Sequence, residues 1–115
     1  MQYRSIPKNG DRLSILGYGC MRLPLFDDGK IDEDKAISQI RHAIDNGVNY
    51  LDTAWPYHGG TSELILATAL QDGYREKVKI ATKLPTWLIH SREDMDGYLN
   101  RQLEKLEGSL KNSLR

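Results

Sequence analysis

The sequence has little of the chemistry that marks several protein classes. Its single cysteine, Cys20, excludes an intrachain disulfide and a metal site built from several cysteines. No apolar run approaches the roughly 20 residues of a membrane span, and the first residues, MQYRSIPKNGDR, lack the apolar core of a secretory signal. Because a lone cysteine is also typical of a reducing compartment, we expect a soluble, cytoplasmic protein.

An excess of charge of either sign is also missing. Sixteen basic and sixteen acidic residues give a formal net charge of zero, and no Lys/Arg run is long enough for a nucleic-acid stripe. The three histidines show no metal-ligand spacing. We therefore expect neither a nucleic-acid partner nor a bound metal. What the chain does have is 39% apolar and 28% charged residues in a length of 115, which fits one compact domain over residues 1–115.

Local patterns predict a hairpin followed by alternating strands and helices. Asn9-Gly10 between two short apolar segments predicts a hairpin with strands at 3–6 and 13–15. Asp32 is a good N-cap for the first helix, and Ser91 with Asp94 resembles a capping box for the third. A strand opening into a loop is expected at 16–24, and the helix capped by Asp32 is expected to run to 46. A strand at 48–52, a helix from Thr61 or Ser62 to Asp72-Gly73 and a strand at 78–83 follow. The apolar face of the third helix is expected to consist of Met95, Leu99, Leu103, Leu106 and Leu110.

Polar side chains follow the predicted strands where function is expected. Regular alternation of strands and helices predicts an α/β fold with a parallel sheet covered by helices. Asp52 and Lys83 then lie at the carboxyl ends of adjacent strands, which is where ligands bind in parallel sheets and barrels. Tyr57 follows Asp52 by five residues in a loop. These three side chains are therefore candidates to meet in space.

The three side chains have complementary chemistry. A tyrosine is a poor acid at neutral pH, because its ordinary pKa is ~10. A nearby lysine cation favours the phenolate and makes a phenol a better proton donor. A carboxylate beside the lysine keeps the lysine charged and fixes its position. Such a trio suits the protonation of a carbonyl oxygen while hydride arrives at the carbon.

Gly17 and Gly19 open a glycine-spaced segment that is not a dinucleotide fingerprint. The third glycine position of that fingerprint is Arg22, and a proline follows where a helix should begin. The two glycines instead predict a close approach of the backbone to neighbouring strands or to a ligand.

Several separated motifs resemble the amino-terminal part of the aldo-keto reductase family. The matching text is LGYGCMRLP, AIDNGVNYLDTAWPYHGGTSE and VKIATKLP. The family pattern has an aspartate in a DTA triplet, a tyrosine five residues later, a G-x-SE helix start and a lysine that ends the next strand. All four are present in this order, and the likeness runs from about residue 2 to 106. The form GYGCMRLP further resembles a branch whose members often carry a carboxyl-terminal iron–sulfur domain, although this chain has no cluster cysteines.

The resemblance implies a (β/α)8 TIM barrel and hydride transfer from NADPH or NADH to an aldehyde or ketone. By this resemblance Tyr57 is the general acid, Lys83 adjusts its acidity and Asp52 pairs with Lys83. Met21 and Arg22 match the segment along the nicotinamide end of the cofactor, which Asp52 and Tyr57 also contact. Residues in loop positions that could line the pocket of a small carbonyl substrate are Trp55, His58 and Trp87.

The chain departs from the family pattern in length. A full barrel has about 250 residues and eight strands, and the sequence predicts an amino-terminal hairpin (1–16) and the first three β/α units (17–106). The family's fourth catalytic residue is a histidine that ends the fourth strand, whereas here QLEKL is followed by EGSLKNSLR, a non-family tail at 107–115. His90 precedes the third helix and is not that histidine. Most of the family's cofactor phosphate and adenine contacts lie in its last strands. We therefore expect an incomplete barrel that is inactive alone.

Two other functions remain open from the sequence. A partial barrel that is not an enzyme would leave strand edges unpaired, and it would self-associate or bind a partner through them. A barrel hydrolase with Asp52 as its base has weaker support, because no metal ligands or nucleophile–base pair accompany that residue.

Overall fold

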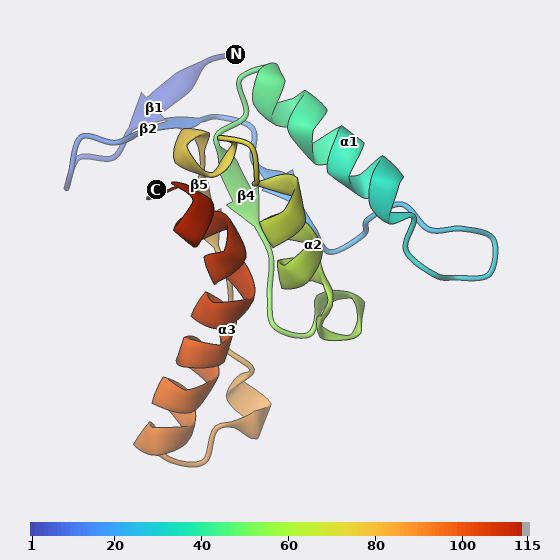
Figure 1. The fold of residues 1–115 in the computed structure, drawn as a ribbon. Helices are drawn as coiled ribbons and strands as arrows, with labels where there is room; N and C mark the ends of the chain where they lie inside the picture. Colours follow the sequence, from blue (N-terminus) through green and yellow to red (C-terminus); the bar gives the residue numbers. More distant parts are fainter. Residues whose placement is uncertain (114–115) are drawn as a thin grey trace.

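A computed structural model describes the backbone of residues 1–113 and the side chains of residues 1–106. Within residues 1–113 the chain forms short strands, three α-helices and three 3₁₀ turns, and Figure 1 shows their arrangement. In order they are β1 (Tyr3–Ser5), β2 (Arg12–Ser14), β3 (Tyr18–Gly19), α1 (Glu33–Asp45), β4 (Tyr50–Asp52), η1 (Tyr57–Gly60), α2 (Ser62–Ala69), η2 (Arg75–Lys77), β5 (Lys79–Ala81), η3 (Thr86–Leu88) and α3 (Arg92–Ser113).

A parallel sheet of the strands β3, β4 and β5, in that spatial order, carries the predicted alternation of strands and helices. Tyr18, Leu51 and Ile80 form one register line across it, and all three pack into the core. Side chains alternate between the two faces of a strand. Asp52, which follows Leu51, therefore faces away from the helices.

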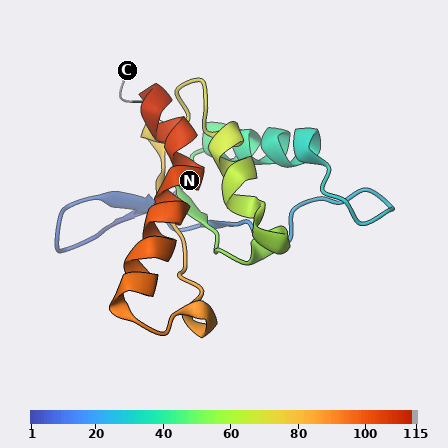
Figure 2. The ribbon, with the colours of Figure 1, turned by 60° about the horizontal axis from the view of Figure 1, so that its bottom comes forward.

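The core lies between this sheet and the helices. Helix α2 packs against both α1 and α3, so the three helices follow one another across one face of the sheet (Figures 1 and 2). Their buried apolar side chains share one cluster with the strands. Its members are Cys20, Leu23, Ala36, Ile40, Ile44, Val48, Leu51, Ile65, Leu66, Ala69, Leu70, Val78 and Leu106.

The antiparallel hairpin of β1 and β2 lies at the amino end of β4, opposite the end that carries Asp52. Its strands pair Tyr3 with Ser14, which confirms the predicted hairpin, and Gly10 has the positive φ (76°) that the turn requires. Asn49, just before β4, accepts from the Ser14 amide at 2.7 Å through its side-chain oxygen. The hairpin is therefore attached to the sheet far from the predicted site.

The predicted helix ends are confirmed with small shifts. The Asp32 carboxylate accepts from the Lys35 amide at 3.1 Å and so caps α1. Ser91 accepts from the Asp94 amide at 3.1 Å, while the Asp94 carboxylate accepts from the amide of His90. Helix α2 ends at Ala69, earlier than predicted. Asp72 and Gly73 form the turn after it, with φ values of 60° and 87°.

The prediction for the buried face of α3 is wrong in part. Leu106 is buried, but Met95, Leu99 and Leu103 are 41%, 41% and 48% exposed. The helix instead turns Gln102, which is 1% exposed, toward the rest of the molecule. Leu110 lies outside the residues whose side chains the structure describes.

The close approach predicted for Gly17 is made to a neighbouring strand. A Cβ at Gly17 would lie 2.9 Å from Cδ1 of the Tyr50 ring, so a larger residue would clash there. A Cβ at Gly19, in contrast, would meet nothing within 4 Å. Gly19 pairs in register with Asp52, so open space borders the sheet next to that carboxylate.

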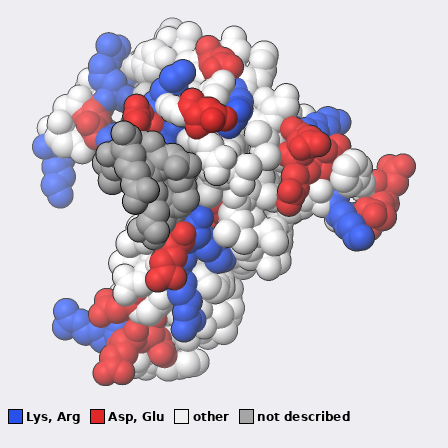
Figure 3. Space-filling view, viewed as in Figure 1, with Lys and Arg blue, Asp and Glu red and all other residues white. Residues whose placement is uncertain are grey.

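Charged side chains of both signs are interspersed on the face of the molecule in Figure 3. Within the described part of the chain, no helix combines the length and the apolar composition needed to cross a membrane.

Candidate active site

Asp52, Tyr57 and Lys83 lie together at the carboxyl end of the sheet. The Lys83 ammonium donates a hydrogen bond to Oδ1 of Asp52 and another, at 2.9 Å, to the Thr53 carbonyl. Its Nζ also lies 5.1 Å from the centroid of the Tyr57 ring. The structure thus places a carboxylate, an ammonium and a phenol in one cluster, with the ammonium in contact with both of the others.

Parallel pairing continues past the strand ends and brings this cluster together. The Thr53 amide donates to the Ala81 carbonyl at 2.8 Å, and the Trp55 amide donates to the Lys83 carbonyl at 3.2 Å. The chain then turns sharply in η1, where His58 and Gly59 have φ values of 55° and 63°. This turn keeps Tyr57 close to the end of β5 instead of letting the loop extend away.

The cluster is open to solvent, and its lysine is positively charged. The side chains of Lys83 and Asp52 are 50% and 37% exposed. Partial burial lowers the pKa of Lys83, but its hydrogen bonds and charge interactions with Asp52 and Tyr57 outweigh burial, so the net pKa is raised. Lys83 is therefore a cation at neutral pH.

Beneath the cluster lies a buried layer of uncharged groups. The Cys20 amide donates to the Asp52 carbonyl at 2.8 Å, and the Ser62 hydroxyl donates to the Cys20 carbonyl at 3.2 Å. Burial and the charge of Asp52 raise the pKa of the Cys20 thiol to about 12, although Lys83 lowers it. The thiol is therefore protonated at neutral pH.

Met21 and Arg22, predicted to contact a cofactor, follow β3 with exposed side chains. They come two and three residues after Gly19. Gly19 pairs in register with Asp52, so the open space at Gly19 adjoins the strand that ends in that carboxylate.

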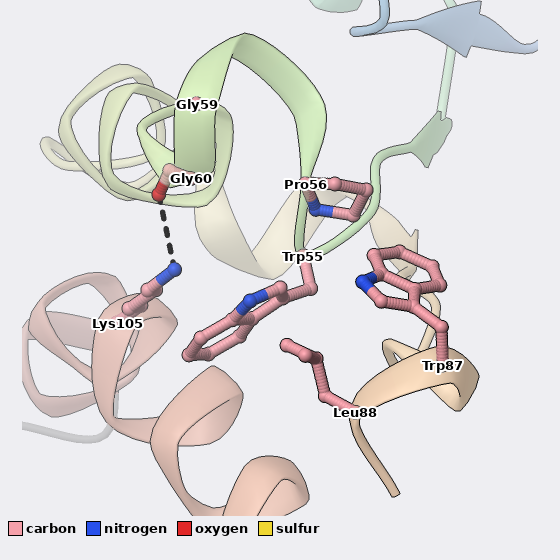
Figure 4. A pocket seen from close by; sticks show the side chains of 7 residues that line it. All are labelled: Trp55, Pro56, Gly59, Gly60, Trp87, Leu88 and Lys105. Atoms are coloured by element: carbon pink, nitrogen blue, oxygen red, sulfur yellow. Dashed lines mark hydrogen bonds between the residues drawn. The ribbon is translucent and has the colours of Figure 1, made fainter.

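Trp55 and Trp87, two of the predicted pocket residues, line one cavity of about 440 Å³ (Figure 4). Their indoles lie on two sides of it, with Leu88 between them. The remaining lining residues are Pro56, Gly59, Gly60 and Lys105.

His58, the third predicted pocket residue, lies elsewhere. Its Nε2 accepts from the Leu23 amide at 2.9 Å, and it borders a different hollow together with Lys30 and Thr61. The structure therefore does not bring His58 into the cavity of the two tryptophans.

Two buried polar residues and one partly buried lysine next to the site were missed by sequence reasoning. Glu63 is 0% exposed and lies 3.7 Å from the Lys105 ammonium through its Oε1. Gln102 is 1% exposed and donates to the Lys83 carbonyl at 2.8 Å. Glu63 stands in the G-x-SE motif, which was a signal that it matters. Gln102 and Lys105 carried no signal, because their partners are far away in sequence.

No group of three or more His, Cys, Asp or Glu side chains that could hold a metal ion is found within the described residues.

Comparisons with known proteins point to one family. The sequence model of the aldo/keto reductase family matches residues 15–112. The aldo-keto reductase YhdN of Bacillus subtilis (strain 168) is 36% identical over 114 residues, covering 96% of this chain and 34% of that protein. The probable aldo-keto reductase 1 of Glycine max is 39% identical over 74 residues, covering 64% of this chain and 21% of that protein. The chain thus spans about a third or less of the curated relatives it matches.

Solved structures agree on the fold. An aldo-keto reductase from Bacillus halodurans in its holo form superposes with a TM-score of 0.73 at 28% identity, covering 93% of this chain and 37% of that one. An aldo-keto reductase from Klebsiella pneumoniae in complex with NADPH gives a TM-score of 0.75, with 93% and 36% coverage. Its 20% identity supports the fold alone. These matches confirm the predicted α/β fold, an incomplete (β/α)8 barrel.

Proposed function

Because the chain belongs to the aldo/keto reductase family, we propose that it forms the proton-donating corner of an NAD(P)H-dependent reductase of aldehydes or ketones. The observation that carries this proposal is the Lys83 ammonium held between the Asp52 carboxylate and the Tyr57 ring. The exposed side of this cluster leaves room for a substrate carbonyl.

Each residue of the cluster has a separate task in this proposal. Tyr57 donates its hydroxyl proton to the carbonyl oxygen as that oxygen gains negative charge. Lys83 stabilises the phenolate that this transfer leaves, because its ammonium lies against the ring. Asp52 keeps Lys83 charged and fixes its position. A nicotinamide cofactor, NADP(H) or NAD(H), supplies the hydride when it is bound.

The residues of this chain that would hold the nicotinamide end are Met21, Arg22, Asp52 and Tyr57. Support comes from the open space at Gly19, where a side chain would fill the volume that a flat ring needs. The cavity of Trp55 and Trp87 would hold the apolar part of the substrate, since aromatic walls favour flat, apolar groups. His58 is left out of this proposal, because its ring accepts from the Leu23 amide and lies outside that cavity.

By themselves these 115 residues are expected to show no turnover. They correspond to 34% of the Bacillus subtilis relative, and by the resemblance most contacts to the cofactor phosphates and adenine belong to later strands. The resemblance to the branch with an iron–sulfur domain, the domain limits at 16 and 106, and the cytoplasmic location remain predictions.

A chimera tests the proposed function. Residues 1–106 would replace the matching segment of the Bacillus subtilis relative, and aldehyde-dependent oxidation of NADPH and NADH would be followed by absorbance. We expect turnover by the chimera and none by the 115-residue chain. Turnover by the chain alone would contradict its expected inactivity. A chimera that folds and binds cofactor without turnover would contradict the proposed function.

A second candidate is self-association without catalysis, and a specific observation favours it. In the described sheet the outer strands β3 and β5 each have one neighbour, and Met95, Leu99 and Leu103 are exposed in a row on α3. Sedimentation velocity over a range of concentrations tests this candidate. Association weakened by the pair Leu99→Gln and Leu103→Gln would support it, whereas a compact monomer at every concentration would count against it.

A further inference from the structure

Helix α3 contacts the end of β5 through one buried amide. Gln102 Nε2 donates to the Lys83 carbonyl at 2.8 Å and to the Thr82 hydroxyl oxygen at 3.3 Å. The Lys83 carbonyl also accepts from the Trp55 amide. Gln102 therefore holds the backbone of the residue whose ammonium lies against Tyr57.

The same helix contacts the loop that carries Tyr57 through one partly buried ammonium. Lys105 Nζ donates to the Gly60 carbonyl at 3.0 Å and lies 3.8 Å from the centroid of the Trp55 ring (Figure 4). Trp55 and Gly60 flank Tyr57 in the chain. Lys105 thus holds both sides of the short segment from which the phenol projects.

Glu63 and Thr82 join these two contacts into one network. The Thr82 hydroxyl donates to Glu63 Oε2 at 3.1 Å, and Glu63 Oε1 lies 3.7 Å from the Lys105 ammonium. Gln102 and Lys105 are three residues apart, so they share one face of α3. A single helix face therefore reaches both segments of the proposed site at once.

Stability alone does not explain why this face is polar. Replacing a buried ionic group by well-packed apolar residues is often neutral or stabilising. This network is also incompletely satisfied, since Gln102 Oε1 has no hydrogen-bond partner among the described residues. What hydrogen bonds add is direction: they fix the two carbonyl groups in space, whereas apolar contacts would allow them to slide.

We propose that Gln102 and Lys105 are positioning residues that set the separation of Tyr57 and Lys83. This proposal rests on the proposed function. Neither residue touches a reacting atom. Gln102 fixes the strand end, Lys105 fixes the loop, and the rigid helix between them fixes the distance. A displacement of about 1 Å in such a site is enough to lower turnover about 100-fold.

NMR of the 115-residue chain tests this proposal without cofactor or substrate. An aromatic ring shifts the signals of protons held over its face upfield, so the ε-methylene protons of Lys83 report its contact with Tyr57. Tyr57→Leu identifies how much of the shift that ring causes. We expect Gln102→Leu and Lys105→Met each to lose most of this upfield shift while the core methyl signals of Ile40 and Leu51 stay in place.

Matched controls make the same side-chain changes at exposed positions. Asn100→Leu replaces an exposed amide on α3, and Lys35→Met removes an exposed ammonium from α1. Both should keep the shift. Loss of the shift in the controls, or its retention in Gln102→Leu and Lys105→Met, would overturn the proposal.

A second variant keeps the test possible if the first one does not fold. Gln102→Met keeps an unbranched side chain of similar length and is used if Gln102→Leu does not fold. Failure of both to fold would mean that Gln102 is required for the fold itself, which also overturns the proposal. The proposed function fails by a different result, an inactive chimera, so the two failures are distinguishable.

Discussion

Glu63 is a carboxylate that solvent does not reach, near the start of α2. Burial raises its pKa, although Thr82, Lys105 and Gln102 lower it in part. A buried carboxylate of this kind resists ionisation. At the scale of single residues, Glu63 therefore links the stability of the fold to pH.

The free energy of unfolding should fall as pH rises above about 4.5, the ordinary pKa of this carboxyl. Over that range the unfolded chain has lost the Glu63 proton while the folded protein still holds it, so the folded state binds more protons. The contribution of Glu63 to the free energy of unfolding is fully present below its ordinary pKa. It is lost progressively as the pH rises from there to the raised pKa of the folded state. Titration of this one carboxyl lowers the free energy of unfolding by at most about 1.4 kcal/mol per pH unit.

Urea unfolding at a series of pH values tests this prediction. Glu63→Gln should flatten the fall, because the amide does not ionise. Glu104→Gln, which removes an exposed carboxylate from α3, serves as the control and should keep the parent's slope. Equal slopes in the parent and in Glu63→Gln would rule out the raised pKa.

The sequence identified residues that lie in recognisable motifs and missed those that act through distant contacts. Asp52, Tyr57 and Lys83 were predictable because strand ends and the family pattern place them. Their meeting is borne out by the contacts of Lys83, while their catalytic roles stay proposals. Gln102 contacts a carbonyl 19 positions earlier and Lys105 one 45 positions earlier. No local pattern encodes such separations.

At the scale of elements, α3 shows the limit of helical periodicity. The spacing of apolar residues predicted one buried face on α3, but Met95, Leu99 and Leu103 on that face are exposed. The spacing of apolar residues gives a face but does not say which neighbour covers it. Helix α3 turns Gln102 and Leu106 toward α2 and β5 instead.

This orientation predicts unequal costs for leucine truncations along α3. Leu106→Ala should lower the free energy of unfolding by about 2–5 kcal/mol, because it opens a cavity in the core. Leu103→Ala should cost less than about 1 kcal/mol, because that side chain is half exposed. Both values come from urea unfolding of the two variants. Equal costs would show that the stripe of Leu103 is buried in solution.

At the scale of the whole molecule, the fold class was predictable and the lengths of its elements were not. Alternating strands and helices indicated a parallel sheet with helices on it, and the sheet order β3, β4, β5 follows the chain. The strands are nevertheless only two or three residues long. Apolar residues continue along the chain beyond the residues that pair within the sheet, so the apolar pattern overestimates the length of each strand.

The relatives show how this molecule relates to a complete barrel. The chain covers 36% and 37% of the two superposed structures, and in it the cluster of Asp52, Tyr57 and Lys83 is already assembled. The three side chains therefore meet within these residues. Under the proposed function, turnover is expected only with the remainder of a barrel.

The effect of Tyr57→Phe on kcat in the chimera is the sharpest test of Tyr57 as the proton donor. Removing a general acid typically lowers the rate by about 10²–10⁴-fold, and phenylalanine keeps the ring that contacts Lys83. We predict a loss of at least about 100-fold in kcat, with cofactor binding unchanged. A Tyr57→Phe chimera that folds, binds cofactor and retains the parent's kcat would contradict the role of Tyr57 as the proton donor.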